Sequence, residues 1–274
     1  MIHNHKPTAD IVGFSNAAQK LRAFFLGRGF VEVHTQDRLS ILAACEDPTT
    51  VATYEYEGQI WPLPQTGQMW LEYELLTKPA LAGVFCLSTS YRNEPNPIPG
   101  RHERIFPMFE FESRGTLDDL RKLEEDLCEY LGLADKTAQV HKSYSELAER
   151  YGTDDLTNKD EKKMQEEFGR VVFLEKFPEH TSPFWNMRRS GTIAHKIDVI
   201  IDGQETIGSA ERSSDVAEMR TRFHTISGGG YARLLHQKFG KERVQQELED
   251  FLSLDFFPRY GGGIGMTRMM QALA

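Results

Sequence analysis

The sequence predicts an α+β fold, in which a mostly antiparallel sheet is flanked by helices. Strand-like segments follow one another along the chain and are separated by long helical insertions, a pattern that favours antiparallel pairing. Hydrophobic residues make up 39% of the 274 residues and charged residues 27%, which is ordinary for a globular protein with a sizeable core. Because no linker-like stretch interrupts the chain, we expect residues 1–274 to form a single domain.

The N-terminal part of the chain is expected to supply one long helix and several strands. Ala17, Leu21 and Phe25 recur at helical spacing within residues 14–28, and Gly29 is a natural end for that helix. The segments that follow are a strand at 30–35, a hairpin at 54–63, a helix at 68–83 and a buried strand at 84–92.

The remaining segments continue the alternation of helices and strands. Thr116 resembles an N-cap that opens a helix, and Gly132 closes that helix. Further segments are a polar helical segment at 143–168 with Gly152 and Gly169 as stops, strands at 171–177 and 196–202, a helix at 230–252, and a glycine-rich strand running into a final helix over 261–273.

The composition argues against several classes of function. The formal net charge of −9 disfavours a broad, charge-driven grip on nucleic acid and leaves room only for a local basic patch. The three cysteines form no CxxC pair, which favours a reduced, cytoplasmic setting. The polar N-terminus has no apolar signal core, and no apolar run approaches the roughly 18 residues of a membrane helix. We therefore expect a cytoplasmic protein without a membrane partner.

The stretch YRNEPNPIPGRHERIFPMFEFE (91–112) carries the most chemical information. Side chains alternate faces along a strand, so Phe106, Glu110 and Glu112 share one face, and Arg92 and Glu94 share a face of the preceding strand. An aromatic ring, guanidinium groups and carboxylates on adjacent strands suit a nucleotide together with an amine. The alternative is a surface hairpin with ordinary cross-strand ion pairs.

A glycine cluster near the end of the chain, GGGIGMTR (261–268), is the second informative stretch. Glycines let a ligand approach the backbone closely, and the helix that follows would present its N-terminus to an anion. By itself such a cluster is more often a tight turn or a site of close packing. It does not match GxxxxGK[ST], so it is not a P-loop.

Together these stretches resemble the catalytic core of the class II aminoacyl-tRNA synthetases, in the aspartate, asparagine and lysine subgroup. The helix at 14–28 with GFVEVHT resembles the family's first motif, YRNE with GRHERIFPMFEFE the second, and GGGIGMTR the third. DVIIDGQETIGSAER (198–212) and TGQMWLE (66–72) resemble further segments of the subgroup. The resemblance implies a six- to seven-stranded, mostly antiparallel sheet with one parallel pair, and a homodimer formed through the first motif.

The resemblance also implies which residues bind ATP. Arg92 would hold the α-phosphate and stabilise the transition state, and Phe106 and Arg268 would clamp the adenine from opposite sides. We expect Arg92 and Arg268 to be catalytic. Ile105 and Thr267 stand where the family usually carries acids. The expected ATP-binding residues are Arg92, Glu94, Arg101, His102, Phe106, Gly265 and Arg268.

By the same resemblance, Asp198 and Glu205 would bind Mg²⁺, and Gln68, Glu110 and Arg212 would bind the amino acid. Glu110 would take the α-ammonium group with the help of Gln68. An arginine at position 212 repels a lysine substrate and suits a carboxylate or an amide, which favours aspartate or asparagine. The alternative for Arg212 is an ion pair with Glu211 or Asp215.

The resemblance leaves the acceptor of the activated amino acid open. The chain carries no segment that we expect to form the subgroup's anticodon-binding domain. One interpretation is a ligase that charges tRNA, a protein or another carrier. A second is an ammonia-dependent asparagine synthetase, and a third is a non-catalytic paralogue that binds an amino acid or nucleotide.

Overall fold

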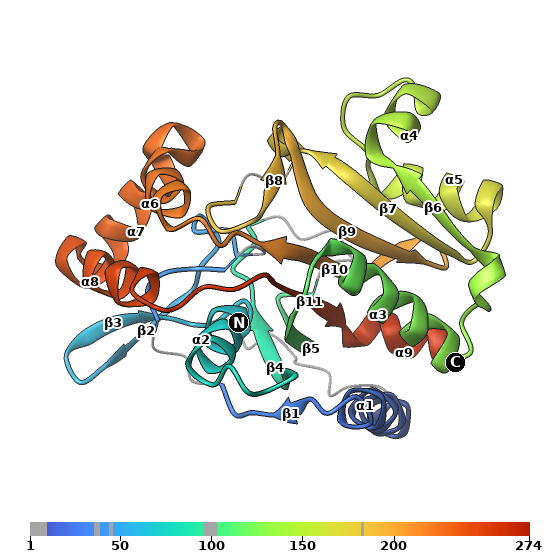
Figure 1. Ribbon diagram of the computed structural model, residues 1–274, viewed down its shortest axis with the longest axis horizontal. Helices are drawn as coiled ribbons and strands as arrows, with labels where there is room; N and C mark the ends of the chain where they lie inside the picture. Colours follow the sequence, from blue (N-terminus) through green and yellow to red (C-terminus); the bar gives the residue numbers. More distant parts are fainter. Residues whose placement is uncertain (1–9, 36–38, 44–45, 96–102, 182–183) are drawn as a thin grey trace.

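A nine-stranded sheet forms the centre of the protein in the computed structural model, which describes residues 10–35, 39–43, 46–95, 103–181 and 184–274 (Figure 1). The strand order is β1-β4-β5-β11-β10-β9-β7-β6, and β8 pairs with β9. The strands of this sheet are β1 (Val31–Glu32), β4 (Gly83–Tyr91), β5 (Ile105–Arg114), β6 (Gln139–Ser143), β7 (Val171–Pro178), β8 (Arg189–Ser190), β9 (Ile193–Ile201), β10 (Gln204–Arg212) and β11 (Arg259–Gly265).

The expected α+β architecture is confirmed, with a larger sheet than the resemblance implied. The pairs β1–β4 and β6–β7 are parallel and the others are antiparallel, so the sheet has two parallel pairs rather than one. Two of the additional strands, β1 and β8, are only two residues long. The GSAER segment at the end of DVIIDGQETIGSAER belongs to strand β10. The expected hairpin at 54–63 is confirmed as β2 (Thr53–Tyr56) and β3 (Gln59–Pro62).

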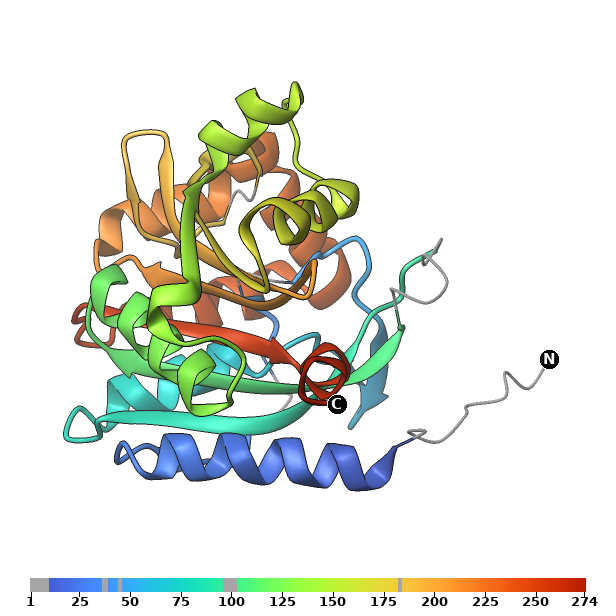
Figure 2. The same ribbon diagram turned by 90° about the vertical axis from the view of Figure 1, so that its right-hand side faces the viewer.

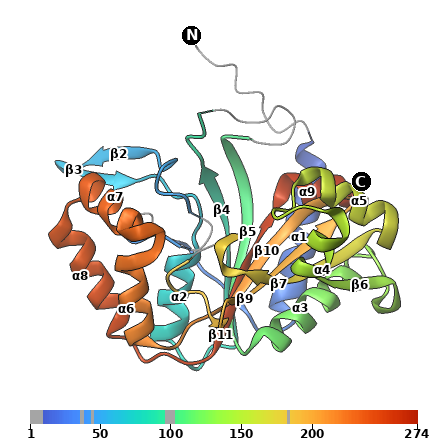
Figure 3. The same ribbon diagram turned by 90° about the horizontal axis from the view of Figure 1, so that it is seen from above.

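Helices cover both faces of the sheet. On one face, α1 (Ile11–Leu26), α3 (Leu117–Tyr130) and α9 (Met266–Leu273) share a hydrophobic core with the sheet, and Figure 2 shows α1 running along this side. The helices of the other face are α2 (Gln68–Thr77), α4 (Tyr144–Tyr151), α5 (Asn158–Phe168), α6 (Val216–Thr225), α7 (Gly230–Phe239) and α8 (Lys241–Leu252). Seen from above, α6–α8 gather at one end of the sheet and α4–α5 at the other (Figure 3).

Two of the predicted helical segments contain breaks. The stop expected at Gly152 is confirmed, because Gly152 adopts φ +67° and ends α4, and Thr157 caps the separate helix α5. The helix expected over 230–252 is broken at Gly240, where φ is +88°. Among the described residues, no helix is both long enough and apolar enough to cross a lipid bilayer.

The alternation of β5 decides which face carries polar chemistry. Phe109 and Phe111 are fully buried against α1, with ring centroids 5.2 and 5.1 Å from that of Phe25. Glu110 and Glu112 therefore point to the opposite face, toward α2. This outcome confirms the prediction that Glu110 and Glu112 share one face of the strand.

Glu175 on β7 gives the fold an acid-sensitive ion pair. Its carboxylate accepts hydrogen bonds from Arg121 Nε and Nη2, both at 2.8 Å, and contacts His141 Nδ1 at 3.0 Å. Burial raises the pKa of Glu175, but Arg121 and His141 outweigh this effect and bring the pKa down from 4.5 to about 2. The folded state thus holds this carboxyl ionised at a pH where the unfolded chain protonates it.

We expect Glu175→Gln to reduce stability at pH 7 and to lose this effect in acid. The contribution of Glu175 is complete above about pH 4.5 and disappears as the pH falls toward 2, a difference of about 3 kcal/mol at most. The measurement is the free energy of urea unfolding of both proteins from pH 7 to pH 3. Glu146→Gln, at an exposed pair with Lys142, is the matched control and should show little pH-dependent difference. An unchanged gap between wild type and Glu175→Gln across this range would contradict the assignment.

Candidate active site

A cavity of about 370 Å³ opens on the acidic face of the sheet, between β4, β5, β10 and the start of α9. The cavity brings together residues that are far apart in the sequence. The lining includes six of the residues expected from the sequence, which are Arg92, Glu94, Phe106, Glu205, Gly265 and Arg268. Arg101 and His102, expected to contact the outer phosphates, lie outside the described residues.

Arg92 is held in the cavity wall as an available hydrogen-bond donor. It follows β4, and its backbone N–H donates to the Arg104 carbonyl at 2.7 Å. Its guanidinium carbon lies 5.3 Å from the ring centroid of Phe106. The buried Nε has no hydrogen-bond acceptor among the described residues. A buried donor without an acceptor is unfavourable in the protein alone, so an anionic ligand would complete it.

Arg268 reaches the same cavity from the first turn of α9. Its guanidinium Nη1 donates to the backbone carbonyl of Glu205, which fixes the side chain across β10. The neighbouring strand β11 is glycine-rich because its neighbours leave no room. A Cβ atom at Gly263 would lie 2.7 Å from Met108 Cε, and one at Gly261 would lie 2.0 Å from Glu112 Oε1. These glycines let large side chains of β5 lie over β11.

Asp198 and Glu205 form a carboxylate pair on β9 and β10. Asp198 is 6% exposed, and its Oδ1 has no hydrogen-bond partner in the described part of the chain. A methyl group at Gly208 would lie 3.1 Å from Glu205 Oε1 and 3.5 Å from Asp198 Oδ1, so glycine leaves space between the two carboxylates. Burial raises the pKa of Asp198 to about 7, against the lowering effect of Lys196.

This pair fits a magnesium ion that keeps other ligands. Hard oxygen donors and a buried oxygen without a partner suit Mg²⁺, which typically takes one or two carboxylates and completes its shell with water and substrate phosphates. The described residues contain no group of three or more histidine, cysteine or acidic side chains that could hold a metal ion. A substrate would therefore have to supply the remaining ligands.

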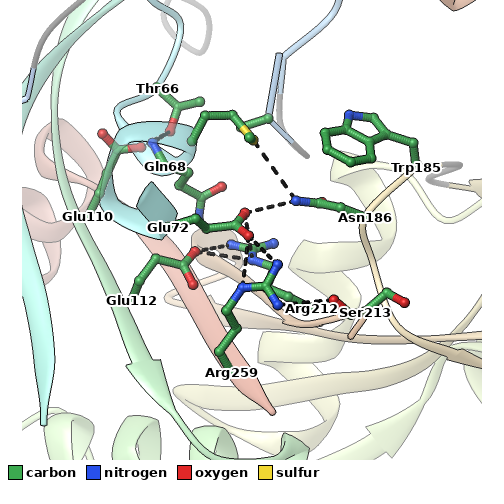
Figure 4. A network of polar contacts seen from close by, with 12 residues as sticks. Thr66, Gln68, Glu72, Glu110, Glu112, Trp185, Asn186, Arg212, Ser213 and Arg259 are labelled. Carbon is green, nitrogen blue, oxygen red and sulfur yellow. Dashed lines mark hydrogen bonds and ion pairs between the residues drawn. The ribbon is translucent and has the colours of Figure 1, made fainter. Parts of the chain in front are cut away.

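The residues expected to bind the amino acid lie in a buried ionic network beside the cavity (Figure 4). Arg212 Nη2 contacts Glu112 Oε1 at 2.6 Å, and Arg259 Nη2 contacts Glu72 Oε2 at 2.6 Å. The two pairs are joined by a 3.7 Å contact between Arg212 Nε and Glu72 Oε1. Two arginines and two glutamates make the network neutral, and all four side chains are at most 2% exposed.

The alternative interpretation of Arg212 as a partner of Glu211 or Asp215 is wrong, because neighbouring residues of β10 point to opposite faces. Glu211 lies on the other face of the sheet, where it contacts Arg188 Nη1 and His195 Nδ1, both at 2.7 Å. Asp215 caps α6 by accepting a hydrogen bond from the Glu218 backbone. Arg212 instead pairs with Glu112.

Gln68 and Glu110 sit at the N-terminus of α2 and do not line the cavity in this conformation. With its amide oxygen turned toward Arg212, Gln68 accepts from Arg212 Nη2 at 2.7 Å. Glu110 is fully buried and accepts from the Gly67 N–H at 2.8 Å and from the hydroxyl of Ser88 at 2.5 Å. Burial raises its pKa, and these hydrogen bonds lower it.

Several residues that the sequence did not single out belong to the site. Glu46 lies close enough to Arg92 and Glu110 to interact with both electrostatically, and burial raises its pKa to about 8. Glu103 lines the cavity and accepts a hydrogen bond from Thr267 Oγ1 at 3.1 Å. For Glu46 the only signal was its place in a polar loop. The family usually carries an acid at the position of Ile105, and in this chain Glu103 supplies an acid two positions earlier.

Comparison with known proteins finds similarity to aspartate– and asparagine–tRNA ligases. An aspartate–tRNA(Asp) ligase of Pyrobaculum aerophilum is 26% identical over an alignment that covers 98% of this chain and 65% of that protein. A cytoplasmic asparagine–tRNA ligase of Dictyostelium discoideum is 26% identical over 64% of this chain and 32% of that protein. The structure of asparaginyl-tRNA synthetase from Pyrococcus horikoshii complexed with asparaginyl-adenylate superposes with a TM-score of 0.76 at 21% identity, over 95% of this chain and 64% of that one.

The chain thus spans less than two thirds of the length of these relatives. The family model described as tRNA synthetases class II (D, K and N) matches residues 2–274. This match covers nearly the whole chain, including the cavity, the carboxylate pair and the buried network. The chain therefore belongs to the class II tRNA synthetases of the D, K and N family.

Proposed function

We propose that this chain uses ATP to activate an amino acid as an aminoacyl adenylate, with release of pyrophosphate. The observation that carries the proposal is that one cavity brings together Arg92, Phe106, Arg268 and Glu205 in a chain of this family. An aromatic ring, two guanidinium groups and an acidic pair match the base, the phosphates and the cation of a nucleotide.

The chemistry requires positioning rather than a protein nucleophile. The substrate carboxylate attacks the α-phosphorus of ATP, a mixed anhydride forms, and the bond to pyrophosphate breaks. Arg92, with an unused Nε donor, would hold the α-phosphate and neutralise charge that builds up in the transition state. Phe106 and Arg268 would fix the adenine, and Gly265 would let the nucleotide lie close to the backbone.

Asp198 and Glu205 are the residues that would hold Mg²⁺, which would screen the charge of the pyrophosphate leaving group. Their positions on adjacent antiparallel strands, with Gly208 between them, leave the two carboxylates facing one space. Glu94 would contact the adenosine portion from the end of β4.

The amino-acid substrate is proposed to be asparagine, with aspartate as the competing candidate. Arg212 is already neutralised by Glu112, so the subsite offers both a donor and an acceptor to a side-chain end. A neutral amide satisfies both groups, whereas a carboxylate would add a negative charge beside buried Glu112 and Glu72. Glu110 and Gln68 would bind the α-ammonium group after leaving their present protein partners.

The test is amino-acid-dependent exchange of pyrophosphate into ATP with each of the twenty amino acids. We expect exchange with asparagine to exceed exchange with aspartate. The reverse preference would contradict the amide assignment while leaving activation intact. No exchange with any amino acid would contradict the activation proposal and favour a protein that binds an amino acid or nucleotide without catalysis.

The same assay, repeated with acceptors, distinguishes the possible second step. Aminoacylated product with bulk tRNA would identify a tRNA ligase. Aspartate-dependent exchange with formation of asparagine from ammonia would identify an asparagine synthetase. Exchange with neither product would indicate a protein or carrier as the acceptor.

We further propose that the described residues belong to one catalytic domain, since the described site residues lie on one sheet, in the segments that follow its strands, or on helices packed against it. A cytoplasmic location remains a prediction from the cysteine content, and Cys86 and Cys128 are buried free thiols. The proposed dimer uses α1 and β1, which expose apolar side chains to an unusual degree. The exposed fractions are 71% for Ile11, 65% for Val12, 53% for Leu26 and 41% for Val31.

We expect a particle of twice the 31.3 kDa chain mass in multi-angle light scattering at micromolar concentration. Val12→Glu should shift it toward the monomer, because the substitution places a charge in an apolar interface. Ile60→Glu, at a 50% exposed residue on the β2–β3 hairpin, is the matched control and should remain dimeric. A wild-type protein that stays monomeric would rule out the dimer.

A further inference from the structure

A second cavity, of about 460 Å³, borders the carboxylate pair of Asp198 and Glu205. Glu205 lines both cavities, and Asp198 and Lys196 line the second one. Tyr144 of α4 and Glu161 of α5 also line it, and Glu161 Oε2 accepts a hydrogen bond from the Glu205 backbone at 3.0 Å. Glu205 is therefore shared by the two cavities, whereas Asp198 borders the second one.

Lys196 lines the second cavity and contacts Asp198 of the carboxylate pair. Its Nζ donates to Asp198 Oδ2 at 2.8 Å and lies 4.2 Å from the ring centroid of Phe177. The contact occupies only one oxygen of Asp198. The other oxygen, Oδ1, lies across Gly208 from Glu205 and has no hydrogen-bond partner among the described residues.

The two carboxylate oxygens of Asp198 therefore have different surroundings. Oδ2 is committed to a protein cation, and Oδ1 faces the space that would take a divalent ion. Lys196 thus offsets one of the two negative charges of the pair, and the Glu161 carboxylate lies beside the pair whether or not Lys196 is present. A divalent ion at Oδ1 would therefore be attracted less strongly and would also be repelled by the nearby ammonium group, in surroundings where burial limits screening.

We propose that Lys196 is a resident counter-ion that keeps the affinity of the carboxylate pair for free divalent cations low until a nucleotide triphosphate supplies further ligands. The proposal rests on the proposed function, in which the cation acts together with ATP. It makes Lys196 a positioning residue, because it holds Asp198 in place before the substrate arrives. The cation and the nucleotide would then enter the site together.

The experiment measures binding of Mn²⁺ alone to the folded protein by electron paramagnetic resonance, with and without ATP. Wild type should bind Mn²⁺ weakly without ATP and much more tightly with it. Lys196→Met, which keeps the length of the side chain and removes its charge, should bind Mn²⁺ alone at least about tenfold more tightly. Lys196→Arg should resemble wild type, and Lys196→Met combined with Asp198→Asn should lose the gain.

Lys142→Met is the matched control. Lys142 makes contacts of the same kind, 2.8 Å from Glu146 and 4.9 Å from the ring centroid of Phe168, but in a more exposed position, and it lines neither cavity. This variant should leave Mn²⁺ binding unchanged. Thermal unfolding of each variant with and without Mn²⁺ provides a second readout, and only Lys196→Met should be stabilised by Mn²⁺ alone.

Two results would overturn the inference. One is tight Mn²⁺ binding by wild type without ATP, which needs no variant to observe. The other is a folded Lys196→Met protein whose Mn²⁺ affinity equals that of wild type. Neither readout depends on catalysis. A protein that exchanges no pyrophosphate would contradict the activation proposal, and its Mn²⁺ binding would still decide the inference about Lys196.

Discussion

Replacing Arg92 with alanine is expected to lower pyrophosphate exchange by about 10²- to 10³-fold, the loss typical when one donor to a developing charge is removed. Arg92 carries a buried Nε without an acceptor, in the wall of the cavity that we assign to ATP. Its loss removes a charge-assisted hydrogen bond to the α-phosphate region, where negative charge increases during attack. The measurement is the exchange rate at saturating ATP and asparagine.

Arg104→Ala provides the matched control for this prediction. Arg104 lies on the same connection between β4 and β5 but is exposed and does not line the cavity. Its replacement should leave exchange within a few-fold of wild type. Circular dichroism and the melting temperature should show that Arg92→Ala folds normally, and wild-type exchange in that variant would make the role assigned to Arg92 untenable.

The largest loss of stability is expected from Arg259→Met. Arg259 is completely buried and gives two hydrogen bonds to Glu72 Oε2, at 2.6 and 3.0 Å, and a third to the Ser213 carbonyl at 3.0 Å. Removing it leaves the Glu72 carboxylate buried beside fewer donors, which should lower the free energy of unfolding by about 3–5 kcal/mol. Urea unfolding at neutral pH measures the change.

Two further variants separate the effect of burial from that of charge. Arg220→Met breaks a surface pair with Glu249 that has a similar contact distance of 2.7 Å, and it should have little effect because both side chains are exposed. Adding Glu72→Gln to Arg259→Met should restore part of the lost stability, since it removes the unpaired charge. Equal losses from Arg259→Met and Arg220→Met would show that burial of the network contributes nothing.

The alternation of strands made much of the site predictable. Because successive side chains on β5 face opposite ways, the acidic face of Glu110 and Glu112 could be separated from the aromatic face without knowing any contact. The motifs then placed Arg92, Phe106 and Arg268 around one ligand, and the structure brings these three residues to one cavity.

The buried network could not be predicted in the same way. Glu72 and Arg259 are 187 positions apart, and each has the sequence surroundings of an ordinary charged residue. Only the packing of α2 against β11 buries them together. Lys196 presented a similar difficulty, because a lysine two residues before an acid on a strand is most often solvated. The break between α4 and α5 was predictable from Gly152, whereas the break between α7 and α8 was not predicted although Gly240 marks it.

Because β11 packs closely against β5, the residues tolerated at two glycines of β11 depend on the side chains beside them on β5. Gly261 and Gly263 do not have positive φ angles, so their backbone would accept other residues. What excludes a larger residue is the neighbour on β5, Glu112 for Gly261 and Met108 for Gly263. In a collection of variants selected for folding, a side chain should therefore arise at position 261 only where that at 112 has become smaller. Covariation of these two pairs would record the spacing of the two strands without any structure determination.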